Sequence, residues 1–258
     1  MMISREYIES LVAKDARLDG RKFDEYRKIE IEYGISSKSA ECSARVKIGD
    51  TEVVAGVKVE LGNPFSDKPD EGSIMVNVEL LPLSSTLFES GPPGIDAIEL
   101  SRVTDRGIRE SKALDFKKLC VKEGEKVWIV MIDIYPINAA GNLFDACNLA
   151  ALAALKDANL PAYDENYKID YSEKTKNKLP MTQLSVGCTV WKVGDKILVD
   201  PLQEEELAAN ARLSVVFTEK GEICAMQKGG ESPLTSDEIS EMVDLAEHKS
   251  KELRRHFK

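Results

Sequence analysis

The sequence predicts an α+β protein made of two related halves, with buried central helices packed against mixed β-sheets. In each half, runs of alternating polar and apolar residues precede a helical pattern. A turn of the same form, Lys-Ile/Val-Gly-Asp, occurs at residues 47–50 and again at residues 192–195. The composition is 43% hydrophobic and 31% charged, as expected of a folded domain with a highly charged surface.

The first predicted element is a short helix over residues 4–14, because Ile8, Leu11 and Val12 lie on one side of it. The alternation of polar and apolar residues then changes to the period of two that a half-buried strand requires. The strands predicted in this way lie at residues 29–33, 44–48, 52–59 and 74–81. Gly49 and Asp50 join the second and third of them into a hairpin.

Two longer helices and one apolar strand are predicted in the middle of the chain. Residues 95–114 show a helical pattern, and residues 127–134 form a β-branched run typical of a strand buried on both faces. Residues 144–158 are rich in alanine and leucine on nearly all sides, which indicates a central buried helix. Residues 163–178 are polar and aperiodic, so we interpret them as a linker.

The second half is predicted to repeat the order of strands and helices. Its strands are expected at residues 184–192, 197–199, 212–218 and 223–227. The last helix begins after Thr235, where Glu238 has the spacing of a capping box. The predicted organisation is an N-terminal extension (1–27), a first half (28–162), a linker (163–180) and a second half (181–258).

Composition and charge exclude several classes of protein. The chain has 35 lysines and arginines against 45 acidic residues, so it is not a free-standing nucleic-acid binder with a basic surface. No apolar run is long enough to cross a bilayer, and the first residues lack a signal core. Five scattered cysteines without a Cys-x-x-Cys pair favour reduced thiols in the cytoplasm. With two histidines, both near the C-terminus, we expect no histidine-rich metal site and no histidine-based triad, and we assign no metal-binding residue and no cofactor.

Three arginines of the first long helix form a possible anion-binding stripe. Arg102, Arg106 and Arg109 fall within about 60° of arc at helical spacing. Guanidinium groups suit phosphate oxygens because they carry paired, permanently charged donors. The same spacing fits a solvated face on which these arginines pair with nearby acidic residues, a common and weak arrangement. The acidic residues in question are Glu99, Asp105 and Glu110.

Carboxylates gather at the end of a predicted strand in the second half. The candidates for acid–base or metal chemistry are Asp195, Asp200 and the run at residues 204–206. The glutamates also suit a helix start, where the helix dipole favours negative charge. No standard glycine-rich phosphate loop occurs. Gly141 and Asn142 are placed either for a phosphate loop or, more simply, for a tight turn.

Taken in order, several segments resemble the RNase PH family over about residues 19–251. They are residues 18–27, 49–51, 98–103 and 198–201 with the glutamates that follow. Within that family, residues 91–94, 105–111 and 141–146 are most similar to the non-catalytic RNase PH-like subunit of the archaeal exosome. The resemblance implies an RNase PH-like fold of two βαβα-type halves. It also implies a six-membered ring in which three such subunits alternate with three catalytic subunits, together with RNA-binding cap proteins.

The departures from the catalytic pattern imply that this chain is inactive alone. Catalytic members have an Arg-Arg pair where this chain has Ile95 and Asp96. Their Ala-Asp-Ala-Gly-Ser-Arg loop, which binds the attacking phosphate, corresponds to residues 138–143. The aspartate of that loop is replaced by Ala139, or by Ala140 if the gap is placed differently, and its arginine by Leu143. The later acids are partly kept, as Asp200 and as Glu205 or Glu206.

The resemblance places Arg102, Arg106 and Arg109 beside the neighbouring subunit's active site, where they are expected to contact RNA phosphates. The chain would then support phosphate-dependent 3′→5′ RNA degradation by its catalytic partner. One alternative is an autonomous phosphorolytic 3′→5′ exoribonuclease with an atypical phosphate site. Another is an oligomerisation module without any role in RNA binding.

Overall fold

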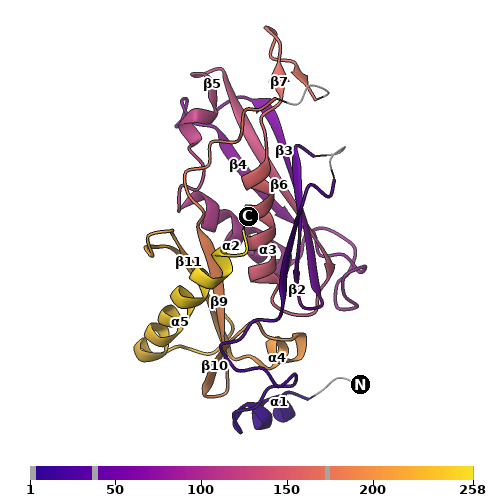
Figure 1. Cartoon of the computed structure of the whole chain (residues 1–258), viewed down its shortest axis with the longest axis vertical. Helices are drawn as coiled ribbons and strands as arrows, with labels where there is room; N and C mark the ends of the chain where they lie inside the picture. Colours follow the sequence, from indigo (N-terminus) through magenta and orange to yellow (C-terminus); the bar gives the residue numbers. More distant parts are fainter. Residues whose placement is uncertain (1–3, 37–39, 172–174, 258) are drawn as a thin grey trace.

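The computed structural model describes residues 4–36, 40–171 and 175–257. Residues 1–3, part of the stretch expected to lack a signal core, lie outside the described residues. Figure 1 shows an elongated molecule in which helix α3 (Leu143–Asp157) runs between the larger sheet and the strands of the second half. The predicted α+β architecture of two halves, each with strands and helices in the order βαβα, is confirmed.

The first half contains a six-stranded sheet in the order β1-β2-β3-β6-β4, with β5 also paired to β6. All its neighbours are antiparallel except β4 and β6, which run parallel. The strands are β1 (Ile29–Tyr33), β2 (Cys42–Ile48), β3 (Thr51–Gly62), β4 (Ser73–Val78), β5 (Cys120–Lys122) and β6 (Lys126–Asn138). The predicted hairpin turn at Gly49 and Asp50 joins β2 to β3.

Strand β6 corrects one prediction, because it is not buried on both faces. Val130, Ile132 and Ile134 are fully buried, whereas Ile129 and Met131 are partly exposed. Helix α3 packs on one face of the sheet, and the side chains that alternate to the other face remain accessible in this chain. The apolar run at residues 127–134 therefore belongs to a strand with one buried face and one partly exposed face.

Two helices cover the first sheet. The central helix α3 is buried on nearly all sides, as its composition predicts, and Leu149, Leu152 and Leu155 are inaccessible to solvent. Helix α2 (Ile95–Arg109) packs against β4, α3 and β12. It ends at Arg109, earlier than predicted, because the chain turns away through Lys112, which has a φ of +53°.

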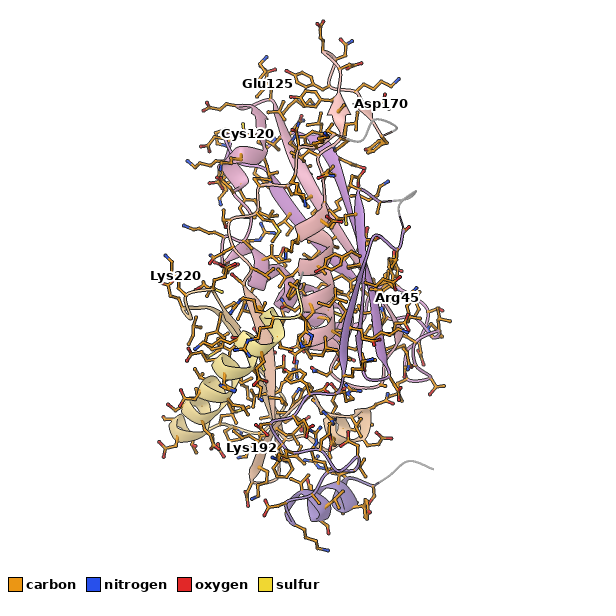
Figure 2. The ribbon with its side chains drawn as sticks, viewed as in Figure 1. Arg45, Cys120, Glu125, Asp170, Lys192 and Lys220 are labelled. Carbon is orange, nitrogen blue, oxygen red and sulfur yellow. The ribbon has the colours of Figure 1, made fainter. Side chains whose placement is uncertain are left out.

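The second half contains a four-stranded antiparallel sheet in the order β10-β9-β11-β12, so in the described part of the chain parallel pairing is confined to the first sheet. Its elements are β9 (Val186–Val193), β10 (Lys196–Val199), α4 (Gln203–Ala208), β11 (Ala211–Phe217), β12 (Ile223–Gly229) and α5 (Ser236–Arg254). The predicted capping box is confirmed, because the Thr235 side chain accepts from the N–H of Glu238 and Glu238 accepts in return. Lys192, labelled in Figure 2, pairs with Glu238 and ties the start of α5 to β9.

The N-terminal residues pack against the second half of the chain. Helix α1 (Arg5–Val12) is capped by Ser4 and contacts α4. Its buried residues Ile8 and Val12 form a separate small core with Trp191 and Val193. Residues 17–27 then continue along the end of β10 toward the first sheet. The N-terminal stretch therefore bridges the two halves.

The segment that the sequence predicts as a linker, residues 163–180, begins with local structure at one tip of the molecule, and its residues 172–174 lie outside the described residues. Strands β7 (Ala162–Tyr163) and β8 (Ile169–Asp170) form a small hairpin there, and η1 (Phe116–Leu119) lies against β5 and β6 near the same end. Figure 2 shows Glu125 and Asp170 at this tip, far from Lys192. No helix within the described residues is long and apolar enough to cross a membrane.

Candidate functional site

The arginine stripe lies on the exposed side of α2, and its three members differ in their exposure and in their hydrogen bonds. Arg102 and Arg106 are exposed, and a shallow hollow lies beside them, next to Val76 of β4. Arg109 is held in place by Asp105, whose carboxylate lies 2.7 Å from Nη2, and by the carbonyl of Ile74, which accepts from the same nitrogen at 2.9 Å. Two of the three guanidinium groups are therefore available to a ligand.

The acidic residues around the stripe are largely committed elsewhere. Asp105 pairs with Arg109, and Glu99 forms an ion pair of 2.5 Å with Arg212 of β11. Among the described residues, no carboxylate lies within 4 Å of the side-chain nitrogens of Arg102 or Arg106. Arg106 Nη1 instead donates to Gln227 Oε1 at 3.1 Å. The helical spacing also allowed all three arginines to form ion pairs with acidic neighbours. Within the described residues, Arg109 is the one that does so.

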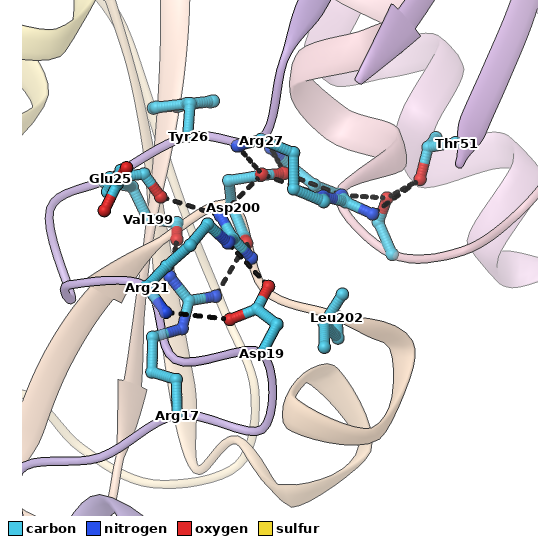
Figure 3. A network of polar contacts seen from close by, with 12 residues as sticks. Arg17, Asp19, Arg21, Glu25, Tyr26, Arg27, Thr51, Val199, Asp200 and Leu202 are labelled. Carbon is cyan, nitrogen blue, oxygen red and sulfur yellow. Dashed lines mark hydrogen bonds and ion pairs between the residues drawn. The ribbon is translucent and has the colours of Figure 1, made fainter. Parts of the chain in front are cut away.

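A second candidate site surrounds Asp200, which directly follows β10 and is completely buried (Figure 3). Arg27 donates to both carboxylate oxygens, from Nη2 at 2.7 Å and from Nε at 2.9 Å, and its backbone N–H adds a bond of 2.8 Å. Arg21 Nη1 donates at 2.9 Å, and Asn142 Nδ2 donates at 3.0 Å. These five hydrogen bonds saturate the Asp200 carboxylate as an acceptor.

A third arginine, Arg17, forms an ion pair with the neighbouring acidic residue, Glu205. The side chains of Arg17 and Glu205 are 0% and 1% exposed, and they form a two-pronged pair with bonds of 2.6 and 3.1 Å. The remaining donors of Arg17 reach the carbonyl oxygens of Asp200, Val199 and Lys22. A buried arginine whose donors are all used holds three chain segments together, here residues 17–22, the end of β10 and α4.

The loop before α3 closes the remaining space around Asp200. Gly141 has a φ of +96°, and a Cβ at this position would lie 2.3 Å from the carbonyl oxygen of Pro201. Its own carbonyl accepts from Thr51 Oγ1 at 2.6 Å and from Arg27 Nη2 at 3.2 Å. Asn142 follows with a left-handed φ of +56°. The two residues form a tight turn pressed against the 200–203 loop, in agreement with the simpler of the two sequence interpretations.

Two further carboxyl groups at this site have raised pKa values. Glu206 accepts from the backbone N–H of Asn142 at 2.7 Å, and burial raises the pKa of Glu206 to about 7 despite that bond. Asp145 accepts from the Tyr26 hydroxyl at 2.6 Å and from the N–H of Thr189 at 2.8 Å. Burial raises the pKa of Asp145 to about 6, against the effect of these hydrogen bonds.

The predicted acidic cluster is therefore brought together only in part. Asp200, Glu205 and Glu206 converge, whereas Asp195 is exposed in the turn between β9 and β10. The glutamates form the first turn of α4, as the alternative interpretation expected. Within the described ranges, no group of three or more histidine, cysteine, aspartate or glutamate side chains is placed to hold a metal ion.

The sequence interpretation missed the residues that neutralise these acids. Arg17, Arg21 and Arg27 lie in an aperiodic stretch, and Arg21 and Arg27 were noted only as part of a family segment. Their partners lie far along the chain, and Asp200 follows Arg21 by 179 positions. The only available signal was the recurrence of arginine in a segment without amphipathic pattern.

Comparison with known proteins supports the fold and the ordered motifs. The model of the 3′ exoribonuclease family matches residues 25–161 with its domain 1 and residues 183–249 with its domain 2. The exosome complex component Rrp42 of Methanocella arvoryzae is 49% identical over 252 residues, which cover 98% of this chain and 94% of the relative. That of Methanothermobacter thermautotrophicus is 46% identical over 252 residues, or 97% and 93% of the two chains.

Solved structures give the same result. A chain of the Archaeoglobus fulgidus exosome with RNA bound to the active site superimposes with a TM-score of 0.91 at 45% identity, covering 98% of this chain and 97% of that one. A chain of an archaeal exosome core superimposes with a TM-score of 0.86 at 42% identity, covering 97% and 94%.

Proposed function

This chain belongs to the 3′ exoribonuclease family, and on that basis we propose that it is a non-catalytic subunit of an exosome. It pairs with a catalytic RNase PH-like subunit, completes the surroundings of that subunit's active site and binds RNA for phosphate-dependent 3′→5′ degradation. The assembly is a ring of six, three of each kind, to which RNA-binding cap proteins are added. We also propose a cytoplasmic location and the division into residues 1–27, 28–162, 163–180 and 181–258.

The observation that carries the non-catalytic role is the saturation of Asp200. A catalytic acid must exchange protons or ligands with the reacting groups, and a phosphate nucleophile needs positively charged partners that are free. Here Arg21 and Arg27 are bound to Asp200, and the Gly141 turn fills the space beside it. Leu143 stands where catalytic members have the phosphate-binding arginine. This arrangement favours a structural role for Asp200.

The RNA-binding role is supported by the free guanidinium groups on α2. Arg102 and Arg106 are exposed, and neither is neutralised by a carboxylate among the described residues. Phosphate contacts of this kind act within a screening length of about 8 Å at physiological salt, so a local stripe can bind RNA despite the net charge of −10. Arg109 keeps fewer free donors, because Asp105 and the carbonyl of Ile74 engage it.

Exposed apolar side chains support a role in an assembly. Ile95 at the start of α2 is 81% exposed, Leu83 is 75% exposed and Met75 of β4 is 60% exposed. Large apolar side chains that are exposed on one chain are typical of surfaces that a partner covers. Met75 and Ile95 belong to β4 and α2, which pack together, so the surface adjoins the arginine stripe.

The test is phosphate-dependent shortening of a 3′-labelled RNA by this chain alone, by the catalytic partner alone and by the two together. We expect the chain alone to be inactive and the mixture to be active. Arg102→Glu combined with Arg106→Glu is expected to lower the activity of the mixture while size-exclusion chromatography shows that the complex remains assembled. Lys14→Glu combined with Lys220→Glu makes the same change of charge at exposed sites outside α2 and serves as the control.

Two outcomes would contradict the proposal. Phosphate-dependent shortening by the pure chain would indicate an autonomous exoribonuclease with an atypical phosphate site. Unchanged activity of the Arg102 and Arg106 double variant would show that these arginines of α2 do not contact RNA. The chain would then act in assembly alone.

A further inference from the structure

Arg212 is held in one position by two neighbours on the second sheet and by one residue of helix α3. It lies in β11 opposite Trp191 of β9 and opposite Gly229 of β12. Its guanidinium carbon lies 4.3 Å from the ring centroid of Phe144 and 5.6 Å from that of Trp191, and its side chain is 12% exposed. A Cβ on Gly229 would lie 2.2 Å from Arg212 Nη1, so the glycine leaves room for the guanidinium group.

From this position Arg212 reaches across to α2 and binds Glu99. The ion pair is 2.5 Å long, and the Glu99 side chain is 30% exposed. Glu99 precedes Arg102 by three residues on the same helix, and residues with that spacing are neighbours on a helix surface. Without Arg212, the carboxylate of Glu99 would therefore have Arg102 as its nearest intrahelical partner.

We propose that Arg212 is a positioning residue for RNA binding, because it sequesters the Glu99 carboxylate and so keeps the Arg102 guanidinium group free for an RNA phosphate. This inference rests on the proposed RNA contact of α2. Arg212 itself faces the Phe144 ring, and its role is to act through Glu99. A half-buried pair is screened by salt less than an exposed pair, so the sequestration persists at physiological ionic strength.

The physical consequence is a change in the charge that a phosphate meets at this end of the stripe. With Arg212 in place, Glu99 is neutralised and Arg102 carries an uncompensated positive charge. With Arg212 removed, Glu99 is free to neutralise Arg102, and the local charge presented to RNA falls by one unit. An exposed pair of this type is worth about 0.2–1 kcal/mol. We therefore expect RNA affinity to fall by about 1.4- to fivefold.

The experiment measures the affinity of the assembled complex, with the catalytic partner present, for a fluorescent single-stranded RNA at several salt concentrations. Arg212→Met keeps an apolar side chain over Phe144 and is expected to weaken binding about 1.4- to fivefold and to make its salt dependence shallower. Glu99→Gln in the Arg212→Met background is expected to restore the affinity, because no carboxylate remains to capture Arg102. A purely structural role of Arg212 would not be rescued in this way.

Two further variants keep the inference testable even if Arg212→Met assembles poorly. Glu99→Gln alone is expected to bind RNA at least as tightly as the unmodified complex, because it frees the charge of Arg212; weaker binding would overturn the inference. In an Arg102→Gln background, the effect of Arg212→Met is expected to vanish, as a double-mutant cycle requires of coupled residues.

The outcomes separate this inference from the function on which it rests. If Arg102→Gln weakens RNA binding but Arg212→Met does not, or if Glu99→Gln fails to restore it, the role of Arg212 is wrong and the RNA contact stands. If Arg102→Gln leaves RNA binding unchanged, both the RNA contact of Arg102 and the role of Arg212 are wrong.

Discussion

Replacing Asp200 by asparagine is expected to destabilise the chain strongly while leaving the activity of its catalytic partner intact. Asp200 has a φ of +47°, a left-handed conformation that asparagine tolerates well, so Asp200→Asn removes the charge with little backbone strain. The amide nitrogen of the new side chain must face donors in either orientation. Arg27 Nη2 and Asn142 approach one oxygen, and Arg21 approaches the other together with Arg27 Nε.

The magnitude follows from the burial of the pair. Asp200 is inaccessible to solvent, and the side chains of Arg21 and Arg27 are 12% and 9% exposed. Removing one partner from a buried charge network leaves uncompensated charge and costs about 3–5 kcal/mol. For a chain of this size that corresponds to a fall in Tm of roughly 6–20 °C.

The assay is urea unfolding of the isolated chain at pH 7, followed by the fluorescence of Trp128 and Trp191. Asp195→Asn makes the same chemical change at an exposed turn and is expected to alter the free energy of unfolding by less than about 0.5 kcal/mol. Phosphorolysis by the assembled complex is measured in parallel, at a temperature where the Asp200→Asn chain remains folded.

Two results would refute the reasoning. A loss of less than about 1 kcal/mol would show that the arginines find other partners or water and that Asp200 does not anchor them. Normal assembly with abolished phosphorolysis would show that Asp200 takes part in catalysis, which contradicts the non-catalytic role.

Two further predictions concern the same site. Because burial raises the pKa of Glu206 to about 7 and that of Asp145 to about 6, the folded state holds these protons more tightly than the unfolded state does. The free energy of unfolding should therefore decrease as the pH rises from 5 to 8. Glu206→Gln should make this decrease smaller by on the order of 1–3 kcal/mol in urea titrations. A decrease of the same size in the variant would contradict the assignment. Gly141→Ala should destabilise by more than about 3 kcal/mol, because its Cβ would collide with Pro201, whereas Gly194→Ala, with open space around it, should cost only about 1–2 kcal/mol in thermal unfolding.

Local patterns predicted the fold wherever the burial of an element matched its periodicity. The alanine- and leucine-rich helix α3 and the β2–β3 hairpin were recognisable because their pattern of exposure follows directly from their sequence. The apolar run of β6 was misleading, because β-branched residues also occupy a sheet face that this chain leaves partly exposed. The end of α2 was placed too late, because the turn at Lys112 carries no glycine or proline to mark it.

The two candidate sites were predictable to different degrees. The arginine stripe follows from helical spacing, but the competition for its acidic neighbours is decided by Arg212, which lies on a distant strand. The Asp200 network has no local pattern at all, because Arg17 and Glu205 are 188 residues apart. Periodicity shows which face of an element is buried, but it carries no information about which distant charged residue a side chain will pair with.

The bridge from residues 17–27 to the end of β10 has a consequence for biosynthesis. Arg21 is translated 179 residues before its partner Asp200, and at about 5–20 residues per second the interval is roughly 10–35 s. During that time the first half can form its sheet against α3, while Arg17 and Arg21 still lack their carboxylate partners. The N-terminus of this chain is thus made first and docked last. The emerging subunit reaches its final shape only after the second half has left the ribosome.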